Sequence, residues 1–506
     1  MHRFFILLAS ASFCLGASGF FVKTTVDFGR DVGQSFGSIF EARDVNGKLV
    51  AGAGFADVYN TRFRVGRRTL QFFVRPTART DKHLLKQLPH PDLDCGVYLM
   101  ELDERLYAWS SVRGNSVRRW DSGSRKWLSE LPPQTPAMRS GDGAMSVGKG
   151  LLVFSGNRAL FNGRQILAAP ADGRYYNFYY AQGWLFFYHT HRRETGGFTR
   201  IVAIPWTTSD PKADLSKAVS MSAKYLGATP FVWGQWRGEV LTVSNQGGVH
   251  VFKNGKWRTV LEAEKEVSYQ VYSMIQYHDR LLLAQYPKGM LFEYRGGKPK
   301  LLEGWPPRLP GVSANAREAQ TMSIYRGELL VGVWPWAELW RHDRDAGEWR
   351  SLGRMFTHPK LTDQKTHPYE VEARRHKLVA NHWGQRITGM VPMGNGLMLS
   401  TSSKGTGKWK DEYKFLTEAK RREYGAVIQL KMPGNLAAKI RWTGHPIELE
   451  FRVENNRMTI LQDGRKLALT SAPQMTWERL SGLKVQWGQG VYGPLNGRLL
   501  KKQHAK

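Results

Sequence analysis

Cysteine is almost absent from this sequence. Among its 506 residues only Cys14 and Cys95 are cysteines. Cys14 lies in an N-terminal segment that we expect to be removed, so Cys95 is left without an intramolecular disulfide partner. Zinc sites built from several cysteines and paired-cysteine redox sites are therefore excluded.

Long apolar runs are lacking beyond the N-terminus. Met1–Gly19 combines a basic Arg3, the apolar run Phe4–Phe13 and small residues near Gly16–Gly19. This is the pattern of a secretory signal peptide. No later stretch approaches the roughly 18 continuous apolar residues that suggest a membrane-spanning helix. The sequence predicts a secreted or periplasmic protein without a transmembrane segment.

Acidic residues are few relative to basic ones. The chain has 43 Asp and Glu against 73 Lys and Arg, which gives a formal net charge of +30. Such a charge concerns partners and solubility rather than fold. No nucleic acid is expected, because an exported chain rarely meets it and no recognition module is visible. The expected partner is an acidic polysaccharide or another cell-surface polyanion; a protein partner, or a solubility bias without a ligand, are the alternatives.

Aromatic and turn-forming residues, in contrast, are abundant. Aromatics make up 12% of the chain and include 18 Trp, which is ample material for a core. The 52 Gly and 23 Pro are dispersed, as expected for many short elements joined by turns. This distribution argues against a helical bundle and favours a large all-β protein.

One sequence pattern recurs seven times. It consists of an alternating strand, a tight turn that usually holds Gly or Asp, and an apolar strand rich in Leu. A third and a fourth strand usually follow, so each unit is a four-stranded meander of roughly 40–50 residues. The seven segments are Tyr98–Ser110, Gly143–Ser155, Tyr176–His189, Phe231–Ser244, Tyr272–Gln285, Thr321–Val333 and Ile387–Ser400.

This layout resembles seven-bladed β-propellers of the kelch or quinoprotein-like kind. One meander cannot bury both of its faces, whereas seven packed radially can. The chain has no Gly-Gly doublet at kelch spacing, and its one Trp-Asp pair, Trp120–Asp121, is not repeated. The resemblance is to the architecture, and it predicts a propeller over residues 91–424.

The two flanks are also strand-rich. In the C-terminal flank, 425–500, a strand ending in Asp463–Gly464 and the closing segment Val491–Leu499 resemble half of a laminin-G or concanavalin A-like sandwich. About 75 residues are too few for a whole sandwich of that type. One hypothesis is that this flank pairs with the N-terminal flank, 20–90, and the propeller is inserted between them. The alternative is that both flanks are accessory strands on the propeller rim. Residues 501–506 are expected to be a frayed basic tail.

The candidate site lies where the blade loops converge. Loops that enter a first strand and loops that join strands two and three share one channel mouth, where ligands usually bind. Two clusters are found there, Tyr188–Arg193 and Asn381–Arg386. The alternative to a ligand site is a solvated basic hairpin for the first cluster and a packed blade junction for the second. The candidate ligand-binding residues are Arg193, Arg174, Arg317, His382, Trp383, Arg386, Trp334 and Trp336.

No metal site and no cofactor are expected. His189 and His191 would share one face of a strand, but no third metal ligand is identifiable beside them. The histidines around 358–382 have irregular spacings that fit no pattern of metal ligands. A polar lid over the mouth is the expected role of that insertion.

Two main functions fit these residues. The first is a non-catalytic protein that binds a uronate- or sulfate-bearing polysaccharide at the basic mouth. The second is a polysaccharide lyase, since the Tyr, His and Arg set resembles that of seven-bladed ulvan lyases. β-Elimination across a uronate would use Arg192, Arg193 or Arg200 as the neutralising cation, His189 or His191 as the base and Tyr188 as the proton donor. A third possibility is a scaffold for protein–protein interaction.

Overall fold

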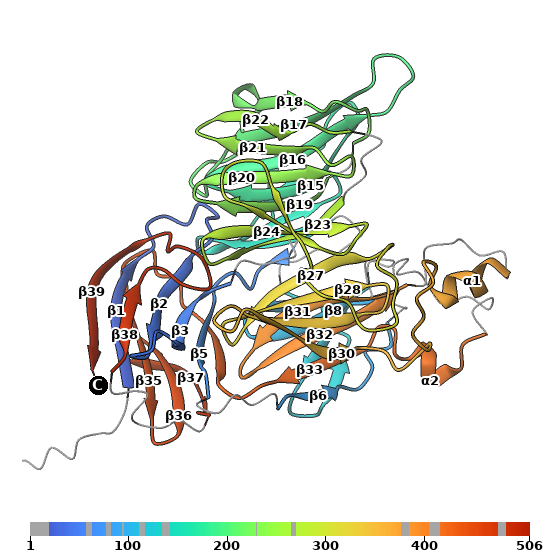
Figure 1. The fold of residues 1–506 in the computed structure, drawn as a ribbon. Coiled ribbons are helices and arrows are strands. Elements are labelled where there is room, and N and C mark those ends of the chain that lie inside the picture. The colour runs from blue at the N-terminus through green and yellow to red at the C-terminus, as the bar shows by residue number, and fades with distance from the viewer. Residues whose placement is uncertain are drawn as a thin grey trace, which may run out of the picture.

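The computed structural model describes residues 20–56, 63–76, 82–93, 96–110, 117–133, 142–228, 230–264, 270–375, 384–403, 415–473 and 482–505. Strands form nearly all of its regular structure. A sandwich of two sheets, a ring of smaller sheets and a short helical excursion follow one another across the molecule (Figure 1). The prediction of an all-β propeller with an added sandwich is confirmed.

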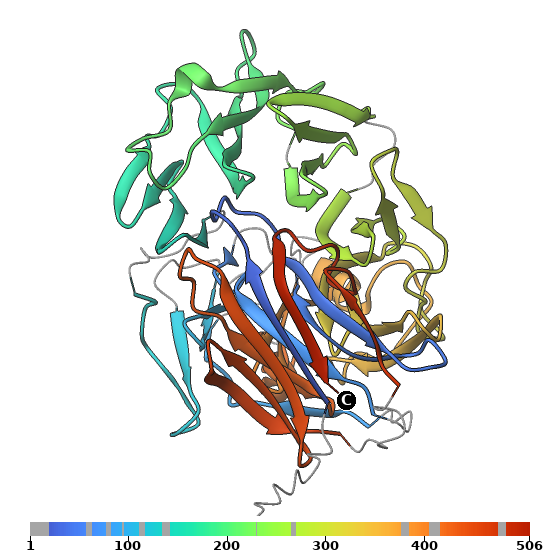
Figure 2. The same ribbon diagram turned by 90° about the vertical axis from the view of Figure 1, so that its left-hand side faces the viewer.

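Seven blades surround a common centre (Figure 2). Blade one consists of β7 (Tyr98–Leu102), β8 (Arg105–Trp109), β9 (Val117–Asp121) and β10 (Lys126–Leu128). Blade two consists of β11 (Gly143–Val147), β12 (Gly150–Ser155), β13 (Arg158–Phe161) and β14 (Arg164–Leu167). Blade three consists of β15 (Arg174–Ala181), β16 (Trp184–His191), β17 (Phe198–Pro205) and β18 (Val219–Ser222), with the 3-10 helix η1 (Leu215–Lys217) before β18. Blades four and five are β19 (Pro230–Trp236), β20 (Glu239–Ser244), β21 (Val249–Lys253) and β22 (Lys256–Leu261); and β23 (Gln270–Tyr277), β24 (Arg280–Tyr286), β25 (Leu291–Tyr294) and β26 (Lys300–Leu302). Blades six and seven are β27 (Glu318–Tyr325), β28 (Glu328–Trp334), β29 (Glu338–Asp343) and β30 (Glu348–Arg354); and β31 (Gln385–Met393), β32 (Gly396–Ser403), β33 (Val427–Lys431) and β6 (Leu84–Gln87).

The turns between first and second strands explain the Gly pattern of the sequence. In blade three, Gln182 and Gly183 have φ values of 54° and 76°, and in blade six Arg326 and Gly327 have values of 55° and 67°. The two-residue type I′ hairpin turn requires positive φ at both of its central residues, and its twist matches that of the paired strands. These turns hold the two inner strands of a blade in register.

The ring is closed by a strand from the N-terminal flank. β6 pairs antiparallel with β33 and becomes the outer strand of blade seven. Its side chains are largely exposed, so main-chain hydrogen bonds rather than side-chain burial hold it in place. For this reason no hydrophobic alternation in the sequence marked it as part of a blade.

The sandwich interleaves both ends of the chain. One sheet has the order β37-β36-β35-β1-β39 and the other the order β34-β5-β3-β2-β38. Its core is aromatic: Phe40 and Phe72 each lie 5.3 Å from Phe451, measured between ring centroids. The strands are β1 (Phe20–Asp27), β2 (Gly37–Arg43), β3 (Leu49–Phe55), β5 (Thr69–Val74), β34 (Asn435–Lys439), β35 (Ile447–Glu454), β36 (Arg457–Gln462), β37 (Arg465–Ser471), β38 (Lys484–Trp487) and β39 (Arg498–Ala505).

The expectation of a frayed tail at 501–506 was wrong for residues up to 505. β39 runs antiparallel to β1, with Lys501 opposite Thr25 and His504 opposite Val22. The segment lacks alternation, since Lys501, Lys502, Gln503 and His504 are all exposed, and its partner strand supplies the order through main-chain pairing.

The sandwich is docked on the first-to-second strand turns of every blade. Because these turns all lie at one end of the channel, the sandwich lies against that end, while blades three and four extend beyond it at the top of Figures 1 and 2. One contact per blade, from blade one to blade seven, is Lys439 with Asp103, Asp31 with Gly148, Val32 with Gly183, Gly33 with Gln235, Val491 with His278, Asn435 with Arg326, and Ala437 with Gly394.

A buried carboxylate and a channel strand fasten this docking. Asp31 has a side chain with no exposed surface, and it pairs with Arg67 at 2.8 Å and with Arg68 at 2.5 Å. Nearby, β4 (Phe63–Arg64) lies parallel to β11, the innermost strand of blade two. The guanidinium of Arg64 donates to the carbonyl of Tyr180 at 2.9 Å. β4 therefore lies inside the channel.

The opposite end of the channel carries the helical excursion. α1 (Pro368–Arg375) and α2 (Glu418–Arg421) lie on the far side of the propeller from the sandwich (Figure 1). This region is packed rather than a solvated polar lid: Nδ1 of His358 lies 2.7 Å from the hydroxyl of Tyr369, and both side chains are buried. We call this end of the channel, which the sandwich does not contact, the open mouth.

Buried histidines should make the fold sensitive to acid. Burial lowers the pKa of His250 and of His342 to about 4, and that of His367 to about 3, from an ordinary value of 6.5. Between the folded-state and the ordinary pKa, these histidines bind protons in the unfolded chain but stay neutral in the folded one. The free energy of unfolding therefore falls as the pH drops below 6.5 and is unaffected above it. For His250 alone the loss between pH 7 and pH 5 is about 2 kcal/mol.

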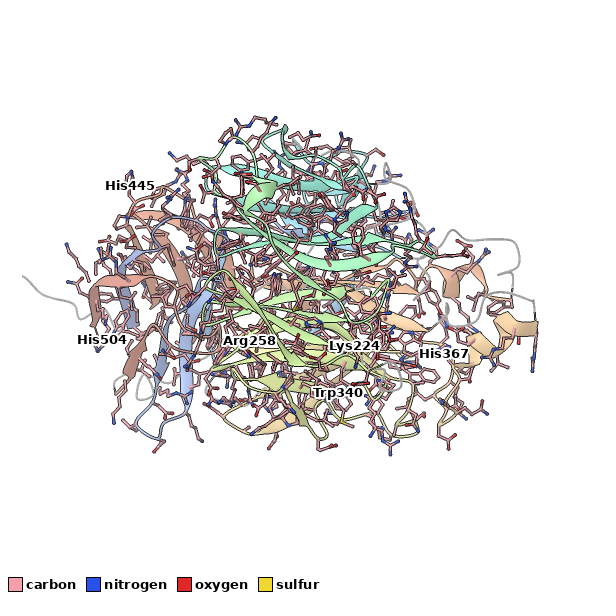
Figure 3. The ribbon with its side chains drawn as sticks, turned by 90° about the horizontal axis from the view of Figure 1, so that it is seen from above. Lys224, Arg258, Trp340, His367, His445 and His504 are labelled. Carbon is pink, nitrogen blue, oxygen red and sulfur yellow. The ribbon has the colours of Figure 1, made fainter. Side chains whose placement is uncertain are left out.

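Urea unfolding of His250→Asn at both pH values measures this effect. The variant should lose about 2 kcal/mol less than the wild type over that interval. His445→Asn, at an exposed position on the sandwich (Figure 3), is the matched control and should behave as the wild type. An equal loss in wild type and His250→Asn would contradict the assignment.

Candidate functional site: the open channel mouth

Neighbouring blades are joined at the open mouth by short parallel bridges. Lys288, between strands two and three of blade five, bridges to Arg317 at the start of blade six. Trp336 of blade six bridges in the same way to Gln385 of blade seven. The loops that the sequence assigned to one mouth therefore meet there.

A repeated β-bulge aims side chains at this mouth. The first strands of blades four, five and six each shift register at one residue, Phe231, Tyr272 and Gln320. A bulge leaves one residue unpaired and re-aims its side chain. Here the re-aimed groups meet across blade boundaries: the ring of Phe231 stacks on that of Tyr272, with centroids 5.2 Å apart and an interplanar angle of 26°.

A buried carboxylate organises these side chains. The hydroxyl of Tyr272 lies 3.3 Å from Oε1 of Glu318 and 2.6 Å from the amide oxygen of Gln270. Gln320 donates to the other oxygen of Glu318. Burial, with a further contribution from Glu318, raises the pKa of Tyr272 above its ordinary value, so the phenol stays protonated and acts as a donor.

Arg386 and Arg174 contribute cations beside aromatic rings. Arg386 donates through Nε to Ser402 at 2.8 Å and through a terminal nitrogen to the hydroxyl of Tyr98 at 3.4 Å. Arg174, an exposed residue, lies over the ring of Tyr176 at 5.2 Å. Half-buried aromatic rings and guanidinium groups thus lie together on several blades at the mouth, and both predicted arginines are among them.

The predicted His-rich cluster forms around an aspartate. Nδ1 of His191 lies 2.6 Å from Oδ1 of Asp172, and Arg193 reaches the same oxygen at 3.3 Å. Nε2 of His189 lies 2.7 Å from the main-chain carbonyl of Asp172. Arg192 turns away to donate to the carbonyl of Gly227 at 3.2 Å. The structure therefore brings both histidines and Arg193 together, as a hairpin held by Asp172.

Tyr188 does not reach the mouth. Its side chain is fully buried between blades three and four, where its hydroxyl lies 3.2 Å from that of Thr242 and its ring packs against Trp233. Burial raises its pKa above the ordinary value for a phenol. Because side chains alternate along β16, Tyr188 lies on the opposite face from His189. It cannot act as a proton donor to a ligand in the mouth.

Arg317 and two tryptophans serve packing rather than ligand contact. Arg317 is buried and pairs with Glu338 at 3.2 Å, and Glu338 has no exposed side-chain surface. Trp336 is 2% exposed and lies between the guanidinium of Arg354 and the imidazole of His367. Trp334 is 5% exposed. The prediction that these three side chains face a ligand is not compatible with their burial.

Two predicted residues, His382 and Trp383, lie outside the described residues. Within the described part of the chain, no group of three His, Cys, Asp or Glu side chains is arranged to hold a metal ion. In that same part, no helix is long and apolar enough to cross a membrane.

The sequence interpretation missed Tyr98, Tyr272, Glu318 and Asp172. Tyr98 and Tyr272 begin two of the recognised repeats, so their positions were known but their exposure to the mouth was not. A bulge gives no period that a sequence reader can count, because it breaks the alternation by one residue. An aromatic residue at the same place in several first strands was the available signal.

Comparison with known proteins finds similar solved structures but no matching family model or curated protein. No protein-family model matches the chain, and neither does any curated protein. Similar solved structures include the WD40 β-propeller domain of Doa1 (11% identity, 70% of this chain and 98% of that chain, TM-score 0.27). Others are BamB from Moraxella catarrhalis (10%, 69% and 98%, 0.28) and YCF48 bound to D1 peptide (9%, 71% and 97%, 0.36). The roles of the mouth residues therefore rest on the geometry of this chain.

The structural role of Arg317 can be measured directly. Arg317→Ala leaves the carboxylate of Glu338 buried without its cation, a change that costs about 3–5 kcal/mol in the free energy of unfolding. Arg193→Ala, in contrast, removes an exposed cation beside Asp172 and should leave that free energy unchanged. Denaturant unfolding of both variants distinguishes the roles. Wild-type stability in Arg317→Ala would show that the buried pair is not structural.

Proposed function

We propose that this protein is secreted and binds an acidic polysaccharide at the open mouth without cleaving it. The observation that carries the proposal is that half-buried aromatic rings and guanidinium groups lie together on several blades at the mouth. Phe231, Tyr272 and Tyr98 supply the half-buried rings, and Arg386 and Arg174 supply the cations. A pyranose ring stacks its C–H face on an aromatic side chain, and a guanidinium matches the geometry of a carboxylate or sulfate.

Further cations on the loops of this mouth would extend the contact along a chain. Arg158 and Lys288 are exposed and form no ion pair with any carboxylate that the structure describes. Unpaired cations attract a polyanion over several residues of its length, and salt screens that attraction. A polymer with regularly spaced negative charges fits such a surface better than a small neutral sugar does.

The lyase hypothesis lacks its proton donor. β-Elimination requires an acid near the leaving oxygen in addition to a base and a neutralising cation. The burial of Tyr188 removes the residue assigned to the first role, and His189 and His191 are engaged by Asp172. Binding without turnover is therefore the function that the described residues support best.

Affinity measurements on a panel of uronate-containing and sulfated polysaccharides test the proposal. The double variant Arg174→Ala/Arg386→Ala removes two charge-assisted contacts and should weaken binding about a hundredfold at low salt. Lys212→Ala/Lys217→Ala removes the same charge from exposed positions on the outer side of blade three and is the matched control.

Each result of this experiment has a defined meaning. A selective loss in the mouth variant, without new absorbance from an unsaturated uronate, supports a binding protein. New absorbance with the wild type would overturn the non-catalytic assignment. Equal affinities for the wild type and both variants would overturn the location at the mouth, and binding of none of the polysaccharides would overturn the ligand class.

A further inference from the structure

A second basic site lies at the other end of the molecule, where the sandwich meets blades one and two. A cleft of about 620 Å³ opens there between the first-to-second strand turns of the two blades and the sandwich strands β34 and β37. We call it the junction cleft. Its volume lies in the range of small-molecule binding sites. It shares no lining residue with the open mouth.

Cations dominate the junction cleft. Its walls carry six of them, Arg68, Lys149, Lys439, Arg441, Arg465 and Lys466, against the two carboxylates of Asp103 and Glu104. Asp103 is neutralised by an ion pair with Lys439. Of the remaining cations, Lys149, Arg441, Arg465 and Lys466 form no ion pair with any carboxylate in the described part of the chain. These charges repel one another, and an anion between them would relieve that repulsion.

One wall contains a buried guanidinium with an unused donor. Arg68 is 6% exposed, and one of its terminal nitrogens donates to Asp31 at 2.5 Å and to the carbonyl of Gly148 at 2.6 Å. Its Nε is buried and has no hydrogen-bond partner. A buried donor without an acceptor costs free energy, so an anionic oxygen that reached this nitrogen would be bound favourably.

Arg68 is also held rigidly, as a preformed site requires. Its guanidinium lies over the indole of Trp442 at 4.8 Å, and that indole stacks on Phe36 with centroids 5.6 Å apart. The sandwich core therefore fixes the orientation of the guanidinium before any ligand arrives. Preorganisation of this kind lowers the ordering cost of binding.

We infer that the junction cleft binds a multiply charged oligosaccharide, with sulfate or carboxylate groups held by Arg68 and by the unpaired cations of both walls. The cleft is a bounded cavity with walls from two parts of the fold, so it would take a short segment or chain end. The inference stands independently of the open mouth, because different residues and the opposite end of the channel carry it. Both sites on one chain would allow it to bridge two polyanion strands.

Calorimetric titration with sucrose octasulfate and, separately, with a digalacturonate tests the inference. Arg441→Ala/Arg465→Ala removes two exposed cations from the sandwich wall and should weaken binding of the preferred probe about tenfold or more. Lys149→Ala removes a cation from the blade wall and should also weaken it. Arg457→Ala/Lys484→Ala removes two exposed cations of the sandwich that lie outside the cleft. It has the same net charge as Arg441→Ala/Arg465→Ala and is the control for that variant.

Trp442 gives a second readout that depends on location. Its indole lines the cleft, so the bound probe should change the tryptophan fluorescence of the wild type, and Trp442→Phe should abolish that change. Sulfate-only or uronate-only binding identifies the preferred anion. Equal weakening by the cleft and control doubles would show unspecific charge attraction and overturn the inference. Loss of probe binding in Arg174→Ala/Arg386→Ala, with the cleft variants unaffected, would place the only site at the open mouth and would also overturn it.

Discussion

The docking of the sandwich on the propeller determines which surfaces of this protein can bind a ligand. The sandwich contacts the first-to-second strand turns of all seven blades. Beside blade two, the amide of Gly148 donates to Asp31 and its carbonyl accepts from Arg68, the ion-pair partner of Asp31. β4 pairs with the innermost strand of blade two inside the channel. The loops at the end that the sandwich does not contact form the open mouth.

The same docking creates the junction cleft. A flat sandwich cannot follow a circular rim at every point, and the space left over blades one and two is lined by side chains from both parts. The net charge of +30 is a sum over the whole chain. The junction cleft and the open mouth are the places where unpaired cations lie close together.

The blades were predictable from the sequence because their inner strands alternate and end in tight turns. The predicted hairpins Phe231–Ser244 and Thr321–Val333 lie within β19–β20 and β27–β28. β4, β6 and β39 were not predicted, since they are short or exposed and their partners order them through the main chain. Pairing between distant segments leaves no local pattern to read.

The candidate site was predictable only in part. Arg174, Arg386 and the His189–Arg193 hairpin reach the mouth, because chain position alone assigns a loop to one end of a blade. Tyr188 and Arg317 were misassigned because position does not reveal which face of a strand, or which buried partner, a side chain meets. The bulged residues Phe231 and Tyr272 were missed for the reason that a bulge interrupts the alternation on which sequence interpretation depends.

The central claim is that the open mouth holds an acidic polysaccharide. Hydrogen exchange measured with and without bound polygalacturonate, or a sulfated polymer if that binds more tightly, tests it most directly. The account predicts slower exchange at the starts of the first strands, residues 231–233, 272–274, 318–321 and 385–388, with the β1–β35 pairing unchanged. Protection confined to other surfaces, with these four segments unaffected by a bound polymer, would contradict it.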